Sequence, residues 1–207
     1  RHVGRTHSFT IDRSTANRIQ RLAQSTGSTL FMTMLSGWAA LLCRHANVAD
    51  IVIGSPMTNR NRSELEPLIG FFVNTIPLRL NFAGNPTTRT ILEQARQVAL
   101  GAYANQDVPF DYIVERIKPE RSLSHTPIFQ TMFVMQNAPT AELAFNDLVF
   151  EAVKTETFVS KFDLTLSVEQ IDQNLCCTIE YSSELFKHAS IENLSAEYAH
   201  LLKEMTV

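Results

Sequence analysis

Apolar residues recur every three or four positions in five stretches of the chain, which is the spacing of amphipathic helices. The predicted helices span roughly residues 14–26, 30–45, 85–106, 109–118 and 190–202. The second is apolar around most of its circumference and is expected to be buried. In the fourth, which Pro109 opens, the residues expected to face inward are Phe110, Ile113, Val114 and Ile117.

Period-two alternation and short β-branched runs predict the strands. They are expected at 6–11, 50–55, 72–80, 127–137, 147–153, 163–171 and 176–182, with 163–181 forming a hairpin. In the stretch 72–80, Asn74 shares a face with large apolar residues, and Pro77 on the opposite face indicates an edge strand or a strand with an irregular partner. The order of elements predicts an α/β or α+β domain in which helices flank a mixed sheet.

Composition and charge exclude several classes of function. The 207 residues are 44% hydrophobic and 19% charged, with a net charge of -3 and no basic stripe, so no nucleic-acid partner is expected. No apolar stretch is long enough to span a bilayer, and no signal peptide opens the chain. Three cysteines without C-x-x-C spacing favour small buried thiols in a reducing, cytoplasmic compartment. The chain starts without methionine and is expected to be part of a longer protein.

Residues that could carry chemistry are few. The six histidines form no metal-binding motif, and neither a G-x-S-x-G elbow nor a glycine-rich phosphate loop is present, so no catalytic residue and no metal site is predicted. A loop histidine such as His125 would need a pocket and an orienting partner to act as a base. Asn59 and Arg60 form either a solvated loop or a polar wall, and Asn74 is either a satisfied buried amide or a substrate contact.

Three motifs follow one another along the chain. The first is the string "IGFFVNT" with the arginine that follows, and its residues Ile69, Gly70, Phe72, Asn74, Thr75 and Arg79 resemble a motif of nonribosomal peptide synthetase condensation domains. The second matches at Gln106, Asp107, Pro109 and Phe110, with Asn105 and Asp111 replacing the histidine and glutamate of the family. The third matches at Arg121, Ser124 and Pro127, with Ser122 and Ile128 as departures. Segments 161–170 and 175–186 resemble the closing part of the family.

The resemblance implies a fold like that of chloramphenicol acetyltransferase, with two α/β lobes and a tunnel between them. The family's His-His-x-x-x-Asp-Gly motif is absent, so residues 1–207 resemble the C-terminal subdomain alone, and the catalytic histidine is expected in an N-terminal subdomain. The implied reaction joins an acyl or peptidyl thioester to an aminoacyl thioester. Both substrates are bound covalently to the phosphopantetheine arms of carrier proteins. No tightly bound cofactor is expected, and an adenylation domain is the expected neighbour.

The same resemblance marks candidate site residues. A wall of neutral polar groups beside the tunnel is expected from Asn59, Arg60, Asn74, Thr75 and Asn137, and structural roles from the remaining motif residues. Segments 137–147 and 163–181 are expected to reach toward the other lobe. Three alternatives stay open: a docking module without turnover, an epimerisation-type relative, which the intact "IGFFVNT" string disfavours, and a coenzyme-A acyltransferase.

Overall fold

The computed structural model describes residues 2–58, 64, 68–120, 125–136 and 159–207, and the fold over these residues has two layers. The strands are β1 His2–Ile11, β2 Asp50–Thr58, β3 Val73–Asn81, β4 Thr131–Gln136, β5 Val159–Ser160, β6 Leu164–Ile171 and β7 Asn174–Ser182. The helices are α1 Arg13–Ser25, α2 Leu30–Ala46, α3 Thr88–Ala104, α4 Phe110–Ile117 and α5 His188–Glu204. The predicted order of elements is confirmed, except that the strand expected at 147–153 lies outside the described residues.

The described strands form one mixed sheet in the order β3-β2-β4-β6-β7-β1-β5. Among these strands β3 pairs, antiparallel, with β2 alone, so Pro77 lies on an edge strand as predicted. The hairpin of β6 and β7 is also confirmed; Asp172 and Gln173 at its turn both have positive φ, which matches the right-handed twist of the strands. β2 and β4 are parallel but are paired only at Gly54 and Met132, and the two strands separate on either side.

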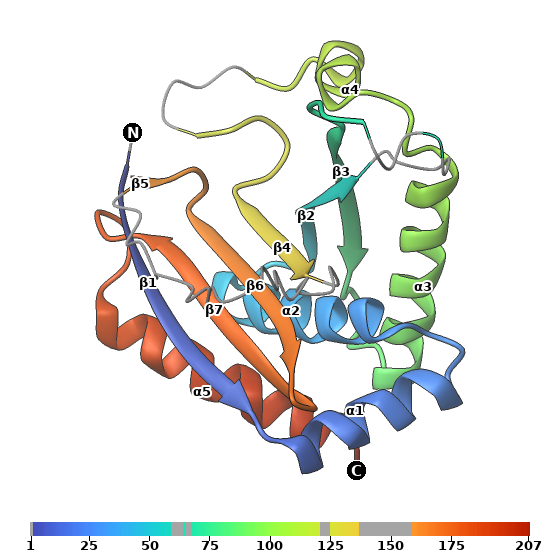
Figure 1. The fold of residues 1–207 in the computed structure, drawn as a ribbon, viewed down its shortest axis with the longest axis vertical. Helices are drawn as coiled ribbons and strands as arrows, with labels where there is room; N and C mark the ends of the chain where they lie inside the picture. The colour runs from blue at the N-terminus through green and yellow to red at the C-terminus, as the bar shows by residue number, and fades with distance from the viewer. Residues whose placement is uncertain (1, 59–63, 65–67, 121–124, 137–158) are drawn as a thin grey trace, which may run out of the picture.

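The core lies between the sheet and the helices that cover one of its faces. α2 and α5 lie behind the sheet in Figure 1, and α3 packs against β3. α2 is buried along most of its length, as expected, with Trp38 fully inaccessible to solvent. A Cβ on Gly37 would lie 2.9 Å from the Leu202 side chain, so this glycine lets α2 and α5 approach closely. Tyr198 donates a hydrogen bond to the Met34 carbonyl across the same contact.

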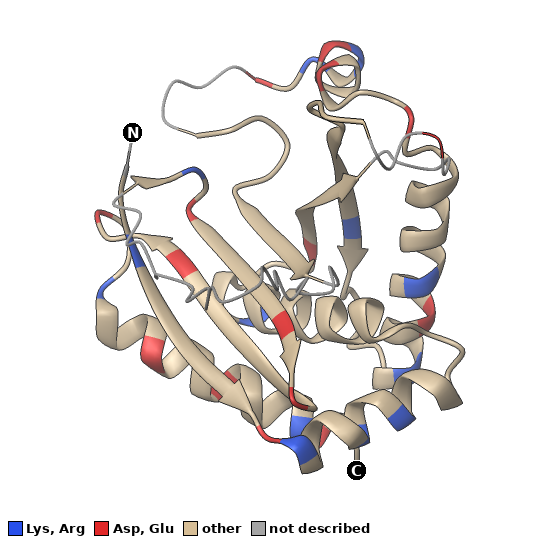
Figure 2. Ribbon diagram, viewed as in Figure 1, with Lys and Arg blue, Asp and Glu red and all other residues tan. Residues whose placement is uncertain are grey.

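The opposite face of β1, β6 and β7 carries small polar side chains. Ser8, Thr178 and Ser167 occupy one row across the three strands and are half-buried or exposed, and the Ser8 and Thr178 hydroxyls lie 3.0 Å apart. The alternate residues, such as Val168 and Cys177, are buried against the helices. Charges are interspersed in sign around the described residues, and β4 in the middle of the sheet carries none (Figure 2).

Three predictions about local structure were wrong. Ile117 is 60% exposed and no residue of α4 is fully buried, because this helix sits at the end of the sheet and not over its face (Figure 1). The strand expected from residue 127 begins only at Thr131, because the backbone turns sharply at Ile128. Cys176 is half-buried, whereas Cys43 and Cys177 are buried, and burial raises the pKa of these two thiols to about 11 and about 12.

No single helix among the described residues has the length and hydropathy needed to cross a membrane. The pair α1 and α2 passes the same test only when taken together, and the two helices are bent by 104° relative to each other.

Candidate functional site: the Asn74 junction

Asn74 lies at the start of β3 and joins this strand to the turn between α3 and α4. Its amide nitrogen donates to the carbonyls of Gln106 and Val108, both at 2.8 Å. Its amide oxygen accepts from the backbone N–H groups of Thr75 at 2.9 Å and Phe110 at 3.2 Å. We call the residues held together by these bonds, 73–75 and 106–110, the Asn74 junction.

These four bonds use the full capacity of the side chain. A primary amide offers two donor hydrogens and one oxygen with two lone pairs, and each of them has a backbone partner. A half-buried polar group that is completely bonded costs the fold little, whereas its removal would leave two carbonyls and two N–H groups without their partner. The geometry therefore favours the structural alternative for Asn74, as a clamp between two of the sequence motifs.

Aromatic packing connects the junction to the third motif. Phe110, whose N–H bonds to Asn74, packs on Phe129 with ring centroids 5.3 Å apart, and Phe129 in turn lies 5.6 Å from Phe162. Gly54 on β2 lies under this cluster, and a Cβ there would overlap the Phe129 ring. A glycine inside a strand marks such a close approach, so the missing side chain makes room for Phe129.

The backbone beside Phe129 is strained. Ile128 has φ of 72°, a region that β-branched residues rarely occupy, and the Phe129 N–H bonds back to the Pro127 carbonyl at 2.9 Å. This is a γ-turn of the strained kind. Two bonds close the turn: the Thr126 hydroxyl donates to the Phe129 carbonyl, and the Gln130 amide donates to the Thr126 carbonyl at 3.0 Å. Strain of this kind persists where surrounding contacts hold it, and here Phe129 supplies them.

An ion pair lies at the far end of β3. Arg79 donates through two nitrogens to the carboxylate of Asp50, in a bidentate arrangement across the β2–β3 pair. The hydrogen bonds from Arg79 hold the pKa of Asp50 below its usual value. Both side chains are substantially exposed, so the pair fixes the strand register more than it stabilises the fold.

A cavity of about 920 Å³ is lined by the starts of β2, β4 and β6, by part of β3 and by the end of α4. Its lining includes Val52, Pro77, Ile117, Ile128 and Leu164, and the Asp50–Arg79 ion pair borders it. A second cavity, of about 960 Å³, lies among α2, α3 and α5, and none of the motif residues that the structure describes lines it. Arg79 of the first motif and Ile128, a departure in the third, line the first cavity.

The chain segment before β3 exposes large apolar side chains. Ile69 and Phe71 are 104% and 92% exposed, and Leu68 and Val73 on either side of them are about half exposed. A Cβ on Gly70 would come within 2.9 Å of the Phe72 ring, so the glycine allows Phe72 to fold back against the segment. Consecutive exposed apolar residues of this size are typical of a surface that another protein segment covers.

Several candidate residues from the sequence come together, and others cannot be placed. The first two motifs meet at the Asn74 junction, which contains their residues Asn74, Thr75, Gln106, Asp107, Pro109 and Phe110. Pro127 of the third motif lies in the γ-turn next to Phe129. Asn59, Arg60, Arg121, Ser124 and Asn137 lie outside the described residues. His125 is exposed, and its described contact is a long one to the neighbouring carbonyl of Thr126.

Sequence reasoning missed part of the site. Gly54, Ile128, Phe129 and Phe162 support the junction but were given no role, although a glycine directly after the β-branched run 51–53 was a usable signal for a close approach. The contact between Phe129 and Phe162 joins residues 33 positions apart and had no local signal.

The structure defines a class of protein: a two-layer α/β domain with a mixed sheet and a motif-built junction at one edge of that sheet. Comparison with known proteins identifies the family. The profile of the condensation domain matches residues 1–207. A linear gramicidin synthase from Brevibacillus parabrevis is 42% identical over 208 residues, which is 100% of this chain. Bacitracin synthase 3 from Bacillus licheniformis is 38% identical over 196 residues, or 95% of this chain. The chain belongs to the condensation domain family.

Solved structures agree with this assignment. A four-domain nonribosomal peptide synthetase in its holo form superposes with a TM-score of 0.87 at 25% identity, over 98% of this chain and 17% of the other. The X-domain from teicoplanin biosynthesis has a TM-score of 0.86 at 21% identity, over 98% of this chain and 47% of the other. The predicted fold class is confirmed. The chain spans 3% of the length of each of the two curated relatives named above.

Proposed function

We propose that this chain is the C-terminal half of a nonribosomal peptide synthetase condensation domain, and that it forms amide bonds together with an N-terminal half. In the reaction, the amine nitrogen of an aminoacyl thioester attacks the carbonyl carbon of an acyl or peptidyl thioester. The new C–N bond replaces the C–S bond, the sulfur leaves with a proton as the free thiol of a phosphopantetheine arm, and the amine loses one proton. The partners are the two carrier proteins and, in the same synthetase, an adenylation domain.

The observation that carries this proposal is the Asn74 junction. It joins two of the motifs by three hydrogen bonds and contacts the third through Phe110 and Phe129. Attack on a thioester develops negative charge on the carbonyl oxygen, and a fixed surface of neutral groups supports that charge better than one that carries anions. The uncharged strand β4 and the neutral amide of Asn74 support such a role, and Asp107 is the one carboxylate in the junction.

The apolar side chains exposed before β3 support the proposal that the chain needs an N-terminal half for activity. Ile69 and Phe71 are almost fully exposed in the chain by itself. An N-terminal half seated on them would bury this apolar surface and would bring the family's histidine motif to the edge of the sheet where the junction lies. The chain alone is therefore expected to be inactive.

Reconstitution tests the proposal. The chain is co-expressed with the N-terminal half of a condensation domain that bears the histidine motif, and carrier proteins loaded with donor and acceptor are added. Intact-protein mass spectrometry then detects the dipeptidyl thioester. Product is expected from the pair, and none from either half or from a pair whose N-terminal histidine is replaced by alanine. A well-folded pair that makes no product would contradict the proposal, and epimerised donor without a new amide bond would indicate an epimerisation-type relative.

A docking module without turnover is the second candidate. The observation in its favour is that an X-domain of the same fold has been solved as a complex with OxyB. The same samples distinguish this candidate from the first, because a docking module would retain loaded carrier protein on a sensor surface and yield no product.

A further inference from the structure

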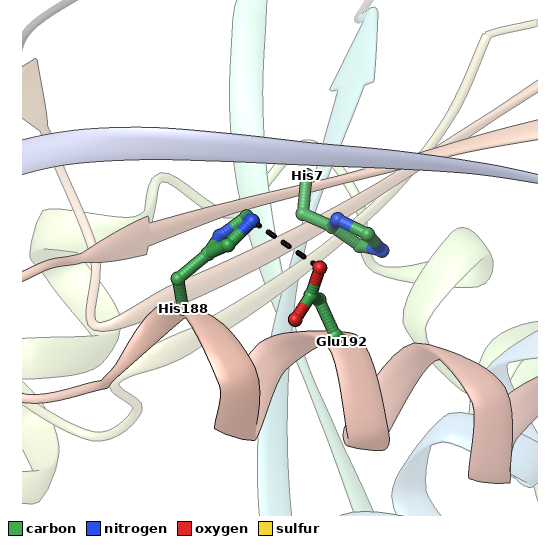
Figure 3. Close-up of side chains that lie close together, drawn as sticks. All are labelled: His7, His188 and Glu192. Atoms are coloured by element: carbon green, nitrogen blue, oxygen red, sulfur yellow. Dashed lines mark ion pairs between the residues drawn. The ribbon is translucent and has the colours of Figure 1, made fainter.

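Two histidines and a glutamate that are distant in the sequence meet on the surface far from the motifs. His7 comes from β1, whereas His188 and Glu192 lie one turn apart at the start of α5 (Figure 3). One ring nitrogen from each histidine and one oxygen of Glu192 all lie within 4.8 Å of one another. We propose that these three side chains bind a divalent transition-metal ion, with zinc as the physiological candidate; this departs from the sequence-based prediction of no metal site.

Hydrogen bonds on the outer side of each ring prepare the histidines as ligands. The Ser195 hydroxyl donates to the Glu192 carbonyl at 2.7 Å, and its oxygen lies 3.0 Å from His7 Nε2, where it can accept from an Nε2–H group. This arrangement favours the tautomer of His7 that carries its lone pair on Nδ1. A metal-bound histidine characteristically donates its other N–H to such a partner.

His188 has the corresponding arrangement. Its Nδ1 lies 2.9 Å from the Tyr181 hydroxyl, and its Nε2 faces the Glu192 carboxylate at 3.5 Å. When Nδ1–H donates to Tyr181, Nε2 is free to bind a metal next to that carboxylate. The ligand set is then two imidazole nitrogens and one carboxylate oxygen, with water completing the coordination, which suits zinc, nickel or copper better than magnesium or calcium.

The three ligand atoms can move close enough together to coordinate one metal ion. Metal–ligand bonds of about 2.1 Å require donor atoms roughly 3.4 Å apart, closer than the 4.8 Å limit of the free side chains. His188 and Glu192 are 50% and 54% exposed, so both can change rotamer without disturbing the core. The pair on α5 is spaced i, i+4, which places both ligands on one helical face.

A serine–histidine nucleophile is the alternative chemistry for this cluster, and the hydrogen bonds argue against it. Ser195 is 4% exposed and its proton is committed to a backbone carbonyl, so the hydroxyl is neither accessible nor oriented for attack. A bound metal would instead connect β1 to α5, through ligands 181 residues apart in the sequence.

The experiment is a titration of the 207-residue chain with zinc chloride by isothermal calorimetry, and with Co²⁺ followed by its visible absorption. One ion per chain is expected, with affinity reduced at least tenfold by His188→Gln and by Glu192→Gln. His45→Gln is the matched control, because His45 and Glu197 form another exposed His–Glu pair, 2.9 Å apart, that has no third ligand among the described residues. This control is expected to bind zinc as the wild type does.

Two results would overturn the proposal: no stoichiometric binding by the wild type, or equal losses in His45→Gln and His188→Gln. Ser195→Ala adds a test of positioning. It removes the bond that favours this His7 tautomer, so it should weaken zinc binding while leaving all three ligands present, and unchanged affinity would contradict the role given to Ser195. Circular dichroism of each variant confirms that the fold is retained.

Discussion

The Asn74 junction and the His7–His188–Glu192 cluster are both polar groups brought together by the fold, but their bonding is opposite. Every donor and lone pair of Asn74 is used by backbone groups of the same chain. Each histidine of the cluster has one nitrogen next to a hydroxyl, and one ring nitrogen of each lies within 4.8 Å of a Glu192 carboxylate oxygen. A side chain whose donors and lone pairs are all used within the chain stabilises the fold, whereas a side chain with an unused nitrogen or oxygen can still bind a ligand. Substitutions in the two regions should therefore behave differently.

The largest effect is expected for Asn74→Ala. The substitution leaves two carbonyls and two N–H groups without their partner. Because the site is half-buried, water can replace only some of the lost hydrogen bonds. The free energy of unfolding should therefore fall by about 3 kcal/mol. Urea unfolding followed by the fluorescence of Trp38, the only tryptophan and fully buried, measures it.

Asn81→Ala is the control for that measurement. Asn81 lies at the other end of β3, is exposed, and accepts one bond from the Ala83 N–H. Its replacement should cost about 0.5 kcal/mol. Equal losses for the two asparagines would show that the bonds of Asn74 do not hold the junction together.

Gly54→Ala tests the support beneath the junction. The added Cβ would overlap the Phe129 ring and lie 2.7 Å from the Met132 sulfur, so the aromatic cluster must shift, at a cost of about 2 kcal/mol. Gly101→Ala is the matched control: it lies inside α3 with nothing within 4 Å of its Cβ, and should stabilise the chain by about 1 kcal/mol. Thermal melts of both variants should therefore move in opposite directions, and a Gly54→Ala variant as stable as the wild type would contradict the packing.

The contrast also explains what the sequence could and could not reveal. The elements and the edge position of β3 followed from periodicity and from Pro77, which are local signals. Asn74 was recognised as unusual because one amide in an apolar strand needs partners, but three of its four partners lie 32 to 36 residues away and no sequence pattern identifies them. His7 and His188 are separated further still, and only the position of α5 beside β1 brings them together.

The inward orientation predicted for Ile117 failed for a related reason. The apolar periodicity of α4 is genuine, but periodicity tells which residues share a face and not what that face will meet. α4 lies at the end of the sheet (Figure 1), and Ile117 lines the cavity at the starts of β2 and β4. The start of β4 was misjudged because the strain at Ile128 is maintained by Phe129 and its neighbours, which are tertiary contacts.

Asp50→Asn should have a smaller effect that depends on pH. The folded-state pKa of Asp50 is lowered by the hydrogen bonds from Arg79, so the pair contributes stability above the ordinary carboxyl pKa of 3.8, and this contribution is lost as pH falls through the folded value. The variant should therefore be slightly less stable than the wild type at pH 7 and should match it at about pH 2. A difference that persists unchanged at low pH would mean that the ion pair is not its origin.

The smallest effect is expected for Glu192→Gln without metal. The side chain is exposed and its contact with His188 is 3.5 Å long, so the free energy of unfolding should stay within about 0.5 kcal/mol of the wild type. With saturating zinc the wild type should gain stability in proportion to ligand binding, and the variant should gain much less. A large loss without metal would make the cluster a structural clamp like Asn74. A loss of stability confined to the zinc-containing samples would show that Glu192 acts as a metal ligand and does not stabilise the fold by itself, unlike Asn74.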